Sequence, residues 1–530
     1  MNSTMHPIDY AIIVVFLIGT LCFGLRFSKK QRTTNNYFLA KGRVPSWALG
    51  ISLLATLISS VTFLAYPGTG YSSNWILLVQ GLMVPIVLVG VIWFIVPLYR
   101  NVINLSTYEY FEQRFGSFAR YYSSVAFVLR QFSGMGTVFF LLAIALNRMI
   151  DANTFTIIFI VGALIILVNL LGGIEAVIWL DVFQGFMLFI SGIICMGVLL
   201  YSVEGGPMEV WKVASEHGRT GFGPYEWDLT KLTFLVMAIN GAFYAIQKYG
   251  TDQTVVQRYL TAKTDKEAIR ASMLGIMLTV PIWTIFMLIG TALFVFYRQQ
   301  PVPADIRADA VFPYFIMTQL PVGVVGLILS AMISAAICSL SADLNSLAAV
   351  CVEDYYKKLA PGKTDKEYLK ASKLTVIFSG LIAMIIAMLY VNAGHEGVLG
   401  IVFTLYAIFS GGIVGIFLLG LFTTRTNTQG ITIAIIVCIV FTAYAVLTST
   451  AVGIGDDKIV LLDLGAFNFT HNTLMLGVYS HLIVIVVGYA ASYLFPKPTI
   501  DKRLLYSGWL ENRRAEKRLE KEQVTISKGR

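Results

Sequence analysis

The chain has 530 residues, of which 57% are hydrophobic and 13% are charged. A soluble protein carries about a quarter charged residues, so this composition excludes a set of water-soluble domains. Apolar runs of roughly 20 residues, the length of a membrane-spanning helix, recur between short polar stretches. The sequence therefore predicts an all-α polytopic membrane protein, because none of the runs alternates like the strands of a membrane barrel.

About thirteen transmembrane helices are expected from these runs. Their centres lie near residues 17, 56, 86, 136, 163, 188, 242, 285, 330, 382, 409, 438 and 484. The first run, 10–23, shows no small-residue cleavage site and is expected to remain as a span. Most of the 39 Lys and Arg residues fall in alternate gaps between the runs, which predicts an N-out/C-in topology.

The net charge of +9 follows from this topology, and it does not indicate nucleic acid binding. The basic tail, 497–530, is expected at the membrane surface, with a helix near 509–522. The five Cys and five His residues are scattered, so they predict neither a disulfide framework nor a metal site. Without nucleotide-binding or hydrolase motifs, we expect no enzyme activity and no cofactor.

Two spans, at 53–73 and 238–260, are dense in hydroxyl groups, Gly and polar residues at mid-membrane depth. Interrupted helices at matching positions of two halves indicate a transporter built from inverted repeats, here spans two to six and seven to eleven. The alternative is that both spans are ordinary helices in which small residues mediate packing.

Four ionisable residues stand out inside the expected spans: Arg130, Asp181, Lys248 and Asp343. Such groups are costly in a membrane, so each is a candidate functional residue. The structural alternative is a buried ion pair that holds helices together, for example between Arg130 and Asp343.

Span nine carries a polar stripe at helical spacing on an otherwise apolar helix. The stripe and its neighbours are Ser334, Ala335, Cys338, Ser339, Ser341 and Asn345. Sodium is a hard cation that prefers oxygen ligands, which hydroxyl groups and the free carbonyls of a broken helix would supply.

Four segments resemble the sodium:solute symporter family. They are NNYFLAKGRVPSWALGISLLAT at 35–56, GGIEAVIWLDVFQG at 172–185, GTDQTVVQRYLTAKTDKEA at 250–268 and CSLSADLNSLAAV at 338–350. The resemblance runs from about residue 8 to about residue 425. It implies a leucine-transporter-type inverted repeat of five plus five helices with additional helices, and sodium-driven uptake by alternating access.

The resemblance also implies a sodium site common to the family. Its residues here would be Ala55, Ile58, Ala335, Cys338 and Ser339. Ser339 fits the family pattern, whereas Cys338 stands where members more often have Ser or Thr, and a thiol is a weak ligand for sodium. A second site, found in some members, is matched by Asp181 and Ser341, although Ala342 replaces another Ser there.

The first broken span is most similar to that of the family's sialic acid carriers. The resemblance implies that Ser59, Ser60 and Thr62 face the solute, and Gln80, Arg130 and Lys248 are further candidate substrate-binding residues that match no family motif. The arginine that binds the sugar carboxylate in those carriers corresponds to Gly134 here. Arg130 lies one helical turn earlier on the same face, and Lys248 would add a second positive charge. A neutral sugar or polyol is the alternative to a carboxylate.

We therefore expect a sodium-coupled symporter for a small polar organic solute, a sugar or a sugar acid such as sialic acid. Its expected partners are sodium, this small-molecule solute and membrane lipid. A carrier of monocarboxylates or other small solutes is the alternative, and a passive channel or facilitator is the alternative of another class. The expected organisation is a first helix and loop (1–45), a transport core (46–425), C-terminal helices (426–496) and a basic tail (497–530), in a bacterial inner (plasma) membrane.

Overall fold

A computed structural model describes residues 5–27, 33–150, 152–300, 306, 308–392, 411–449, 451–452 and 459–515. These residues form a bundle of helices, with β1 (Ala451–Val452) and β2 (Ile459–Val460) as a short antiparallel pair. Nine of the described helices are long and apolar enough to cross a membrane, and the bent pair α3–α4 makes a tenth span. The prediction of an all-α polytopic membrane protein is confirmed.

The long helices follow one another in two comparable series, each beginning with an interrupted span. The first series, after α1 (Pro7–Phe27), contains α3 (Ser46–Leu57), α4 (Ser60–Ser72), α5 (Ile76–Val102), α7 (Ser117–Ile150) and α8 (Thr154–Ser202). The second contains α10 (Phe234–Gly250), α11 (Gln253–Thr261), α12 (Asp265–Gln299), α14 (Val324–Val350), α16 (Asp365–Asn392) and α18 (Ile413–Phe422). Helices α19 (Thr428–Ser449) and α20 (Thr473–Ala491) follow.

Three features account for the difference from the thirteen expected spans. The spans near 163 and 188 are joined in α8, in which two helices totalling 49 residues meet across a kink, so they count as one element although the length suffices for two spans. Gly173 interrupts α8 with φ 56°, which favours glycine. The span near 242 is divided into α10 and α11, of 17 and 9 residues. The expected span near 409 lies largely outside the described residues.

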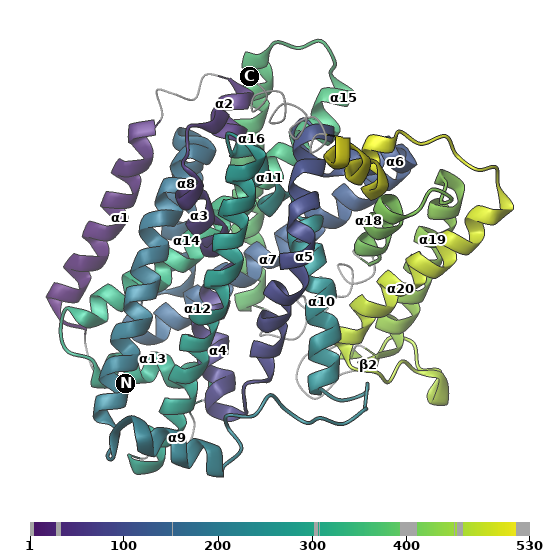
Figure 1. Ribbon diagram of the computed structural model, residues 1–530. Coiled ribbons are helices and arrows are strands. Elements are labelled where there is room, and N and C mark those ends of the chain that lie inside the picture. Colours follow the sequence, from purple (N-terminus) through teal and green to yellow (C-terminus); the bar gives the residue numbers. More distant parts are fainter. Residues whose placement is uncertain are drawn as a thin grey trace, which may run out of the picture.

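The segments expected on the inside and on the outside lie at opposite faces of the bundle. Helices α2 (Thr34–Leu39), α6 (Tyr108–Phe115) and α15 (Lys357–Leu359) and the helical residues 506–515 lie at the upper face in Figure 1. Helix α9 (Gly206–Glu216) and β2 lie at the lower face. This arrangement agrees with the alternation of basic and non-basic gaps along the sequence.

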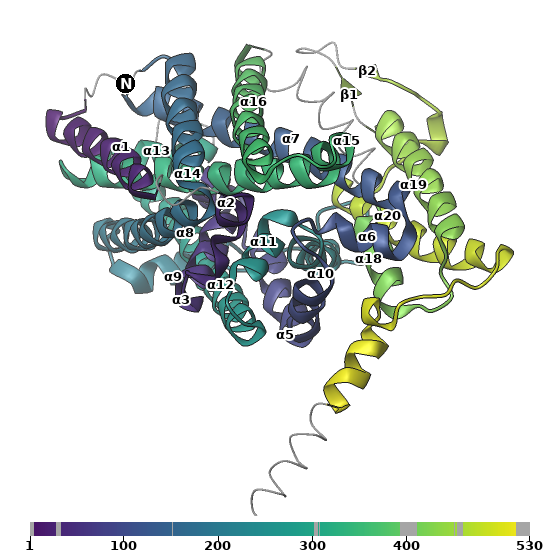
Figure 2. The same ribbon diagram turned by 90° about the horizontal axis from the view of Figure 1, so that it is seen from above.

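Helix α14 is almost enclosed by neighbouring helices, whereas α1 lies at the edge of the bundle (Figure 2). In the most apolar 18 residues of each span, 89% of the residues are buried in α14 but only 28% in α1. Asp9 of α1 is nevertheless buried, because its Oδ1 accepts the N–H groups of Gly323 at 2.8 Å and Gly326 at 2.7 Å at the start of α14. This cap ties α1 to the central helix.

Helix α12 contacts both α3 and α4 at glycine residues. A Cβ atom at Gly275 of α12 would lie 3.0 Å from the carbonyl oxygen of Gly50 in α3. A Cβ atom at Gly290 of α12 would lie 2.9 Å from the Cα atom of Gly70 in α4. Between the two contacts α12 contains Pro281. The backbone of α12 is therefore packed directly against both parts of the interrupted span.

Candidate functional site

The second span is interrupted between α3 and α4, where the sequence predicted the first break. Helix α3 ends at Leu57 because Ile58 is extended, with φ −104° and ψ 120°, and α4 begins at Ser60. The two helices meet at a bend of 57°. A helix end exposes carbonyl oxygens and a helix start exposes N–H groups. This break therefore offers acceptors for a cation and donors for an anion within a few residues.

Helix α14 packs against the broken span at this point. The Oγ of Ser339 donates a hydrogen bond to the carbonyl oxygen of Ile58 at 3.0 Å. Ala55 and Ala335, each 3% exposed, lie on α3 and α14, which are in contact. The structure thus brings together Ser339 and Ile58, two of the residues implied for the common sodium site, and both contribute the oxygen atoms that a hard cation prefers.

Cys338 is directed toward α8 rather than toward the break. Its thiol donates to the Oε1 of Gln184 at 2.9 Å, whereas the neighbouring Ser339 contacts Ile58. Successive side chains of an α-helix diverge by about 100°, so positions 338 and 339 face different helices. The structure therefore separates the side chain of Cys338 from that of Ser339.

Asp181 of α8 is paired with an arginine. Its Oδ2 accepts from Arg258 at 3.0 Å and from the hydroxyl of Ser52 at 2.6 Å, and the Nε of Arg258 contacts the same hydroxyl at 2.8 Å. Asp181 and Arg258 are each 1% exposed. Among the described residues, Asp181 Oδ1 and the Oγ of Ser341 are buried without a hydrogen-bond partner. The carboxylate is therefore neutralised through one oxygen, Oδ2.

The span near 242 is interrupted between α10 and α11, and its break is charged. Asp252, just before α11, accepts the N–H of Thr254 on Oδ1 at 2.8 Å. Its Oδ2 pairs with the Nζ of Lys248 at 2.8 Å and with the guanidinium of Arg130 from α7. The side chain of Asp252 is fully buried. One carboxylate thus caps α11 and neutralises two cations.

The sequence predicted an ion pair between Arg130 and Asp343 as the structural alternative, and that choice of partner is wrong. Arg130 pairs with Asp252, while Asp343 accepts from the Nε2 of Gln131 at 2.7 Å. Arg130 and Gln131 are adjacent on α7, so their side chains diverge by about 100° and reach different neighbours, as those of Cys338 and Ser339 do on α14. Both basic residues expected near the solute, Arg130 and Lys248, are bound to one aspartate.

The hydroxyl residues expected to contact the solute gather at the start of α4. Ser60 donates from its Oγ to the carbonyl of Val138 in α7 at 3.2 Å, and the Oγ1 of Thr62 lies 3.5 Å from the N of Ser59. Ser60 and Thr62 are buried, and Ser59 is half-buried. The first turn of α4 is therefore a polar surface inside the bundle.

Gly134 and Gln80 lie on two helices of the first repeat, α7 and α5. A Cβ atom at Gly134 would meet nothing within 4 Å, so this position has room for a side chain. Gln80 is half-buried, and its Cα lies 2.9 Å from where a Cβ would stand at Gly241 of α10. Gln80 thus lies at the contact between α5 and α10, and α10 is the helix that ends at the second break.

Sequence reasoning missed two residues of these networks, Asp252 and Arg258. Asp252 and Arg258 both stand in the quoted motif at 250–268 and in the span at 238–260, but neither was among the candidate residues. For Asp252 the sequence did carry a signal, because Lys248 lies four residues earlier and an i, i+4 pair meets on a helix. Arg258 is buried in the last turn of α11, because this short polar helix, which follows the second break, lies inside the bundle.

An α-helical bundle with two interrupted spans at matching positions of two series, and oxygen donors at the first break, is a secondary transporter of the leucine-transporter type. A family model described as the sodium:solute symporter family matches residues 37–438. The chain belongs to this family. It is therefore a sodium-coupled solute symporter and a multi-pass membrane protein, not an enzyme.

Similar proteins extend the comparison over almost the whole chain. A sodium/sialic acid symporter of Aliivibrio fischeri is 31% identical over 498 residues, which are 93% of this chain and 94% of that protein. A sodium/sialic acid symporter of Proteus mirabilis is 33% identical over 439 residues, 82% of this chain and 88% of that protein. A solved sodium-coupled sialic acid symporter, in a substrate-bound outward-open state, aligns with a TM-score of 0.84 at 30% identity, covering 93% and 99% of the two chains.

Proposed function

We propose that the protein imports a sialic acid or a related sugar acid together with sodium, across the plasma membrane of a bacterium with the N-terminus outside. The similarity to sodium/sialic acid symporters from two bacteria, over most of each chain, supports this solute class. The observation that carries the proposal is the first break. There the carbonyl of Ile58 accepts a hydrogen bond from Ser339 of α14, two residues before the hydroxyl-rich start of α4 at Ser60.

The solute carboxylate is assigned to the start of α4. Helix N-termini attract anions because their first N–H groups lack intrahelical acceptors and the helix dipole is positive there. Ser59, Ser60 and Thr62 add hydroxyl donors to that end. Arg130 and Lys248 already neutralise Asp252, so a solute carboxylate would have to compete with a buried aspartate for them.

Sodium is assigned to the carbonyls of Ala55, Ile58 and Ala335 together with the hydroxyl of Ser339. Ile58 is directly followed by the first solute residue, Ser59, so an ion that fixes the end of α3 against α14 also fixes the start of the solute site. A ligand that binds one state better shifts the population toward that state, which is the thermodynamic basis of coupling.

A second sodium ion is assigned to Asp181 and Ser341. Support comes from the two buried oxygens without hydrogen-bond partners among the described residues, Asp181 Oδ1 and Ser341 Oγ. Asp181→Asn keeps the shape of the side chain and removes the charge, so it is expected to weaken the sodium dependence of uptake. Unchanged sodium activation in a folded Asp181→Asn protein would exclude this second ion.

The proposal is tested by uptake of radiolabelled sialic acid into proteoliposomes that contain the purified protein. An inward sodium gradient should drive accumulation, whereas an equal potassium gradient should not. A passive facilitator would equilibrate the sugar at the same rate in both cases, and a monocarboxylate carrier would take up lactate in place of sialic acid.

A matched pair of competitors tests the carboxylate assignment. The methyl ester of sialic acid keeps the ring and removes the negative charge, so it should compete at least tenfold more weakly than the acid, because a charge-assisted hydrogen bond contributes ~1.5–3 kcal/mol. Thr62→Val, which removes only the hydroxyl, should weaken the acid more than the ester. Equal competition by acid and ester would favour a neutral sugar.

A further inference from the structure

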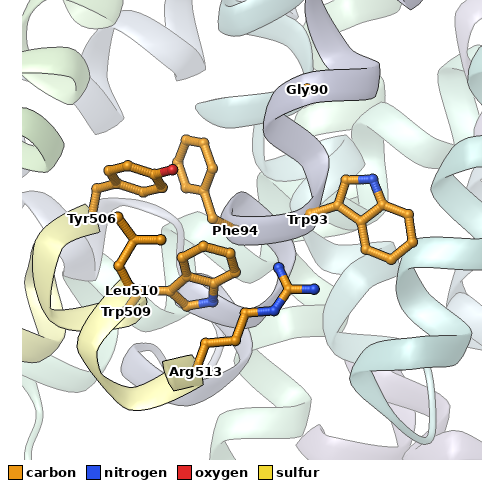
Figure 3. Close-up of a pocket in the computed structure, with 7 residues that line it drawn as sticks. All are labelled: Gly90, Trp93, Phe94, Tyr506, Trp509, Leu510 and Arg513. Atoms are coloured by element: carbon orange, nitrogen blue, oxygen red, sulfur yellow. The ribbon is translucent and has the colours of Figure 1, made fainter. Parts of the chain in front are cut away.

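The helical residues 506–515, here called the tail helix, lie beside α5 at the rim of the bundle (Figure 2). An open cavity of about 430 Å³ separates the two elements, within the range of ~300–1,000 Å³ typical of small-molecule sites. Trp93 and Gly90 border it on α5, and Arg513 extends toward them from the tail helix (Figure 3). None of these residues belongs to the sodium or solute sites.

Aromatic rings fix the tail helix against α5. The rings of Tyr506 and Trp509 stack at 5.7 Å with an interplanar angle of 19°, and Phe94 packs against them at 4.9 and 6.1 Å. Phe422 of α18 also contacts Tyr506 at 5.5 Å. These contacts hold the tail helix on two transmembrane helices, so the cavity is built by packed side chains on both sides.

The cavity lies at the level where the hydrocarbon meets the polar surface. Trp93 precedes Arg100 by seven residues, about 10 Å along the helix, and Arg100 binds Asp265 at 2.6 Å near the end of α5. Below the cavity, α5 exposes Ile86, Val89 and Trp93 at helical spacing, with 67, 40 and 45% of each residue exposed. This apolar stripe faces the lipid acyl chains.

The cavity wall carries a positive charge and no negative one. The two acids within residues 501–515 are paired elsewhere, Glu511 with Lys502 at 3.0 Å and Asp501 with Arg503 at 2.6 Å. Within residues 501–515 no ion pair involves Arg513, whose guanidinium lies 5.1 Å from the ring centre of Trp509. Neither Asp nor Glu lines the cavity among the described residues.

We propose that this cavity binds one anionic glycerophospholipid from the adjoining leaflet. Its phosphodiester accepts hydrogen bonds from the planar fork of Arg513, which matches phosphate geometry. One acyl chain lies on the stripe formed by Ile86, Val89 and Trp93. An uncharged glycerol headgroup fits better than ethanolamine, because the wall offers no carboxylate to the ammonium group. The occupant is therefore phosphatidylglycerol or a lipid of the same chemistry.

The test is native mass spectrometry of the full-length protein in detergent, titrated with dioleoylphosphatidylglycerol or dioleoylphosphatidylethanolamine. The wild-type protein should retain one phosphatidylglycerol with at least tenfold preference over phosphatidylethanolamine. Arg513→Gln should weaken this binding about tenfold. Arg514→Gln, which removes a neighbouring charge that does not line the cavity, is the matched control and should leave the binding unchanged.

A second variant tests the cavity independently of the charge. A Cβ atom at Gly90 would meet nothing within 4 Å, so the side chain of Gly90→Leu has room to begin in the cavity and should abolish retention of the lipid. Glycerol 3-phosphate at millimolar concentration should not displace the lipid, because it lacks the acyl chain. Equal retention of both lipids, displacement by glycerol 3-phosphate, or unchanged binding in Arg513→Gln and Gly90→Leu would overturn the proposal.

Discussion

The two interrupted spans occupy corresponding positions in the two series but differ in chemistry. At the break between α3 and α4, Ile58 and Ser59 are uncharged, and the carbonyl of Ile58 meets the hydroxyl of Ser339. At the break between α10 and α11, Asp252 is fully buried and bound to both Lys248 and Arg130. The first break presents weak polar groups to neighbouring helices, and the second is held by charges.

This difference teaches that an interrupted helix alone does not define a binding site. Weak, neutral groups such as a hydroxyl and a carbonyl can exchange partners when an ion or solute arrives. A buried carboxylate between two cations cannot release one of them without a large cost, because the remaining charges stay in a medium that solvates them poorly. We therefore expect the first break to bind ligands and the second to hold helices together.

The largest effect is expected from Asp252→Asn. This change leaves Lys248 and Arg130 without their counter-charge and should destabilise the protein by about 3 kcal/mol. Thermal unfolding of the detergent-solubilised protein measures it. Asp343→Asn is the control, because Asp343 accepts from neutral Gln131 and its loss should cost less. An Asp252→Asn protein as stable as the wild type would show that charge does not hold the second break.

Ser339→Ala tests the first break. Removing one oxygen ligand should raise the sodium concentration for half-maximal uptake about fivefold, equal to ~1 kcal/mol, with little loss of stability. Ser330→Ala on the same helix is the matched control, since its hydroxyl bonds the carbonyl of Gly326 within α14 at 2.8 Å. Equal sodium activation in the two variants would remove Ser339 from the sodium site.

Arg130→Gln separates structural from solute-binding roles. Lys248 still neutralises Asp252 in this variant, so we expect a smaller loss of stability than in Asp252→Asn, about 1–2 kcal/mol. The ratio of affinities for sialic acid and its methyl ester should stay constant. If the affinity for the acid alone falls tenfold or more, Arg130 binds the solute carboxylate directly.

The smallest effect is expected from Cys338→Ser. The side chain at 338 contacts Gln184, and a serine hydroxyl can donate to the same oxygen, so the half-saturating sodium concentration should change less than twofold. Sodium-dependent uptake measured at several sodium concentrations checks this. A severalfold increase in sodium affinity would instead place position 338 on the ion, because a hydroxyl is a better ligand than a thiol.

The sequence predicted the fold class and the first break because both depend on local patterns, namely apolar runs and a cluster of hydroxyl residues. It also placed Ile58 and Ser339 in one site through the family resemblance. It did not find the partner of Arg130, because a pair between α7 and the start of α11 depends on how deeply the second interruption enters the bundle. Arg258, in α11, was missed for the same reason, because its burial depends on how α11 packs inside the bundle.

The contacts of α12 limit how the first break can change its angle. Because α12 touches α3 at Gly50 and α4 at Gly70 backbone to backbone, neither half-helix can rotate independently of it. A change in the 57° bend therefore requires α12 itself to flex between Gly275 and Gly290. Pro281 lies within that interval, where its missing N–H removes one helical hydrogen bond and lowers the resistance to bending. We therefore expect α12 to bend at Pro281 whenever the angle between α3 and α4 changes, so the two bends would move together.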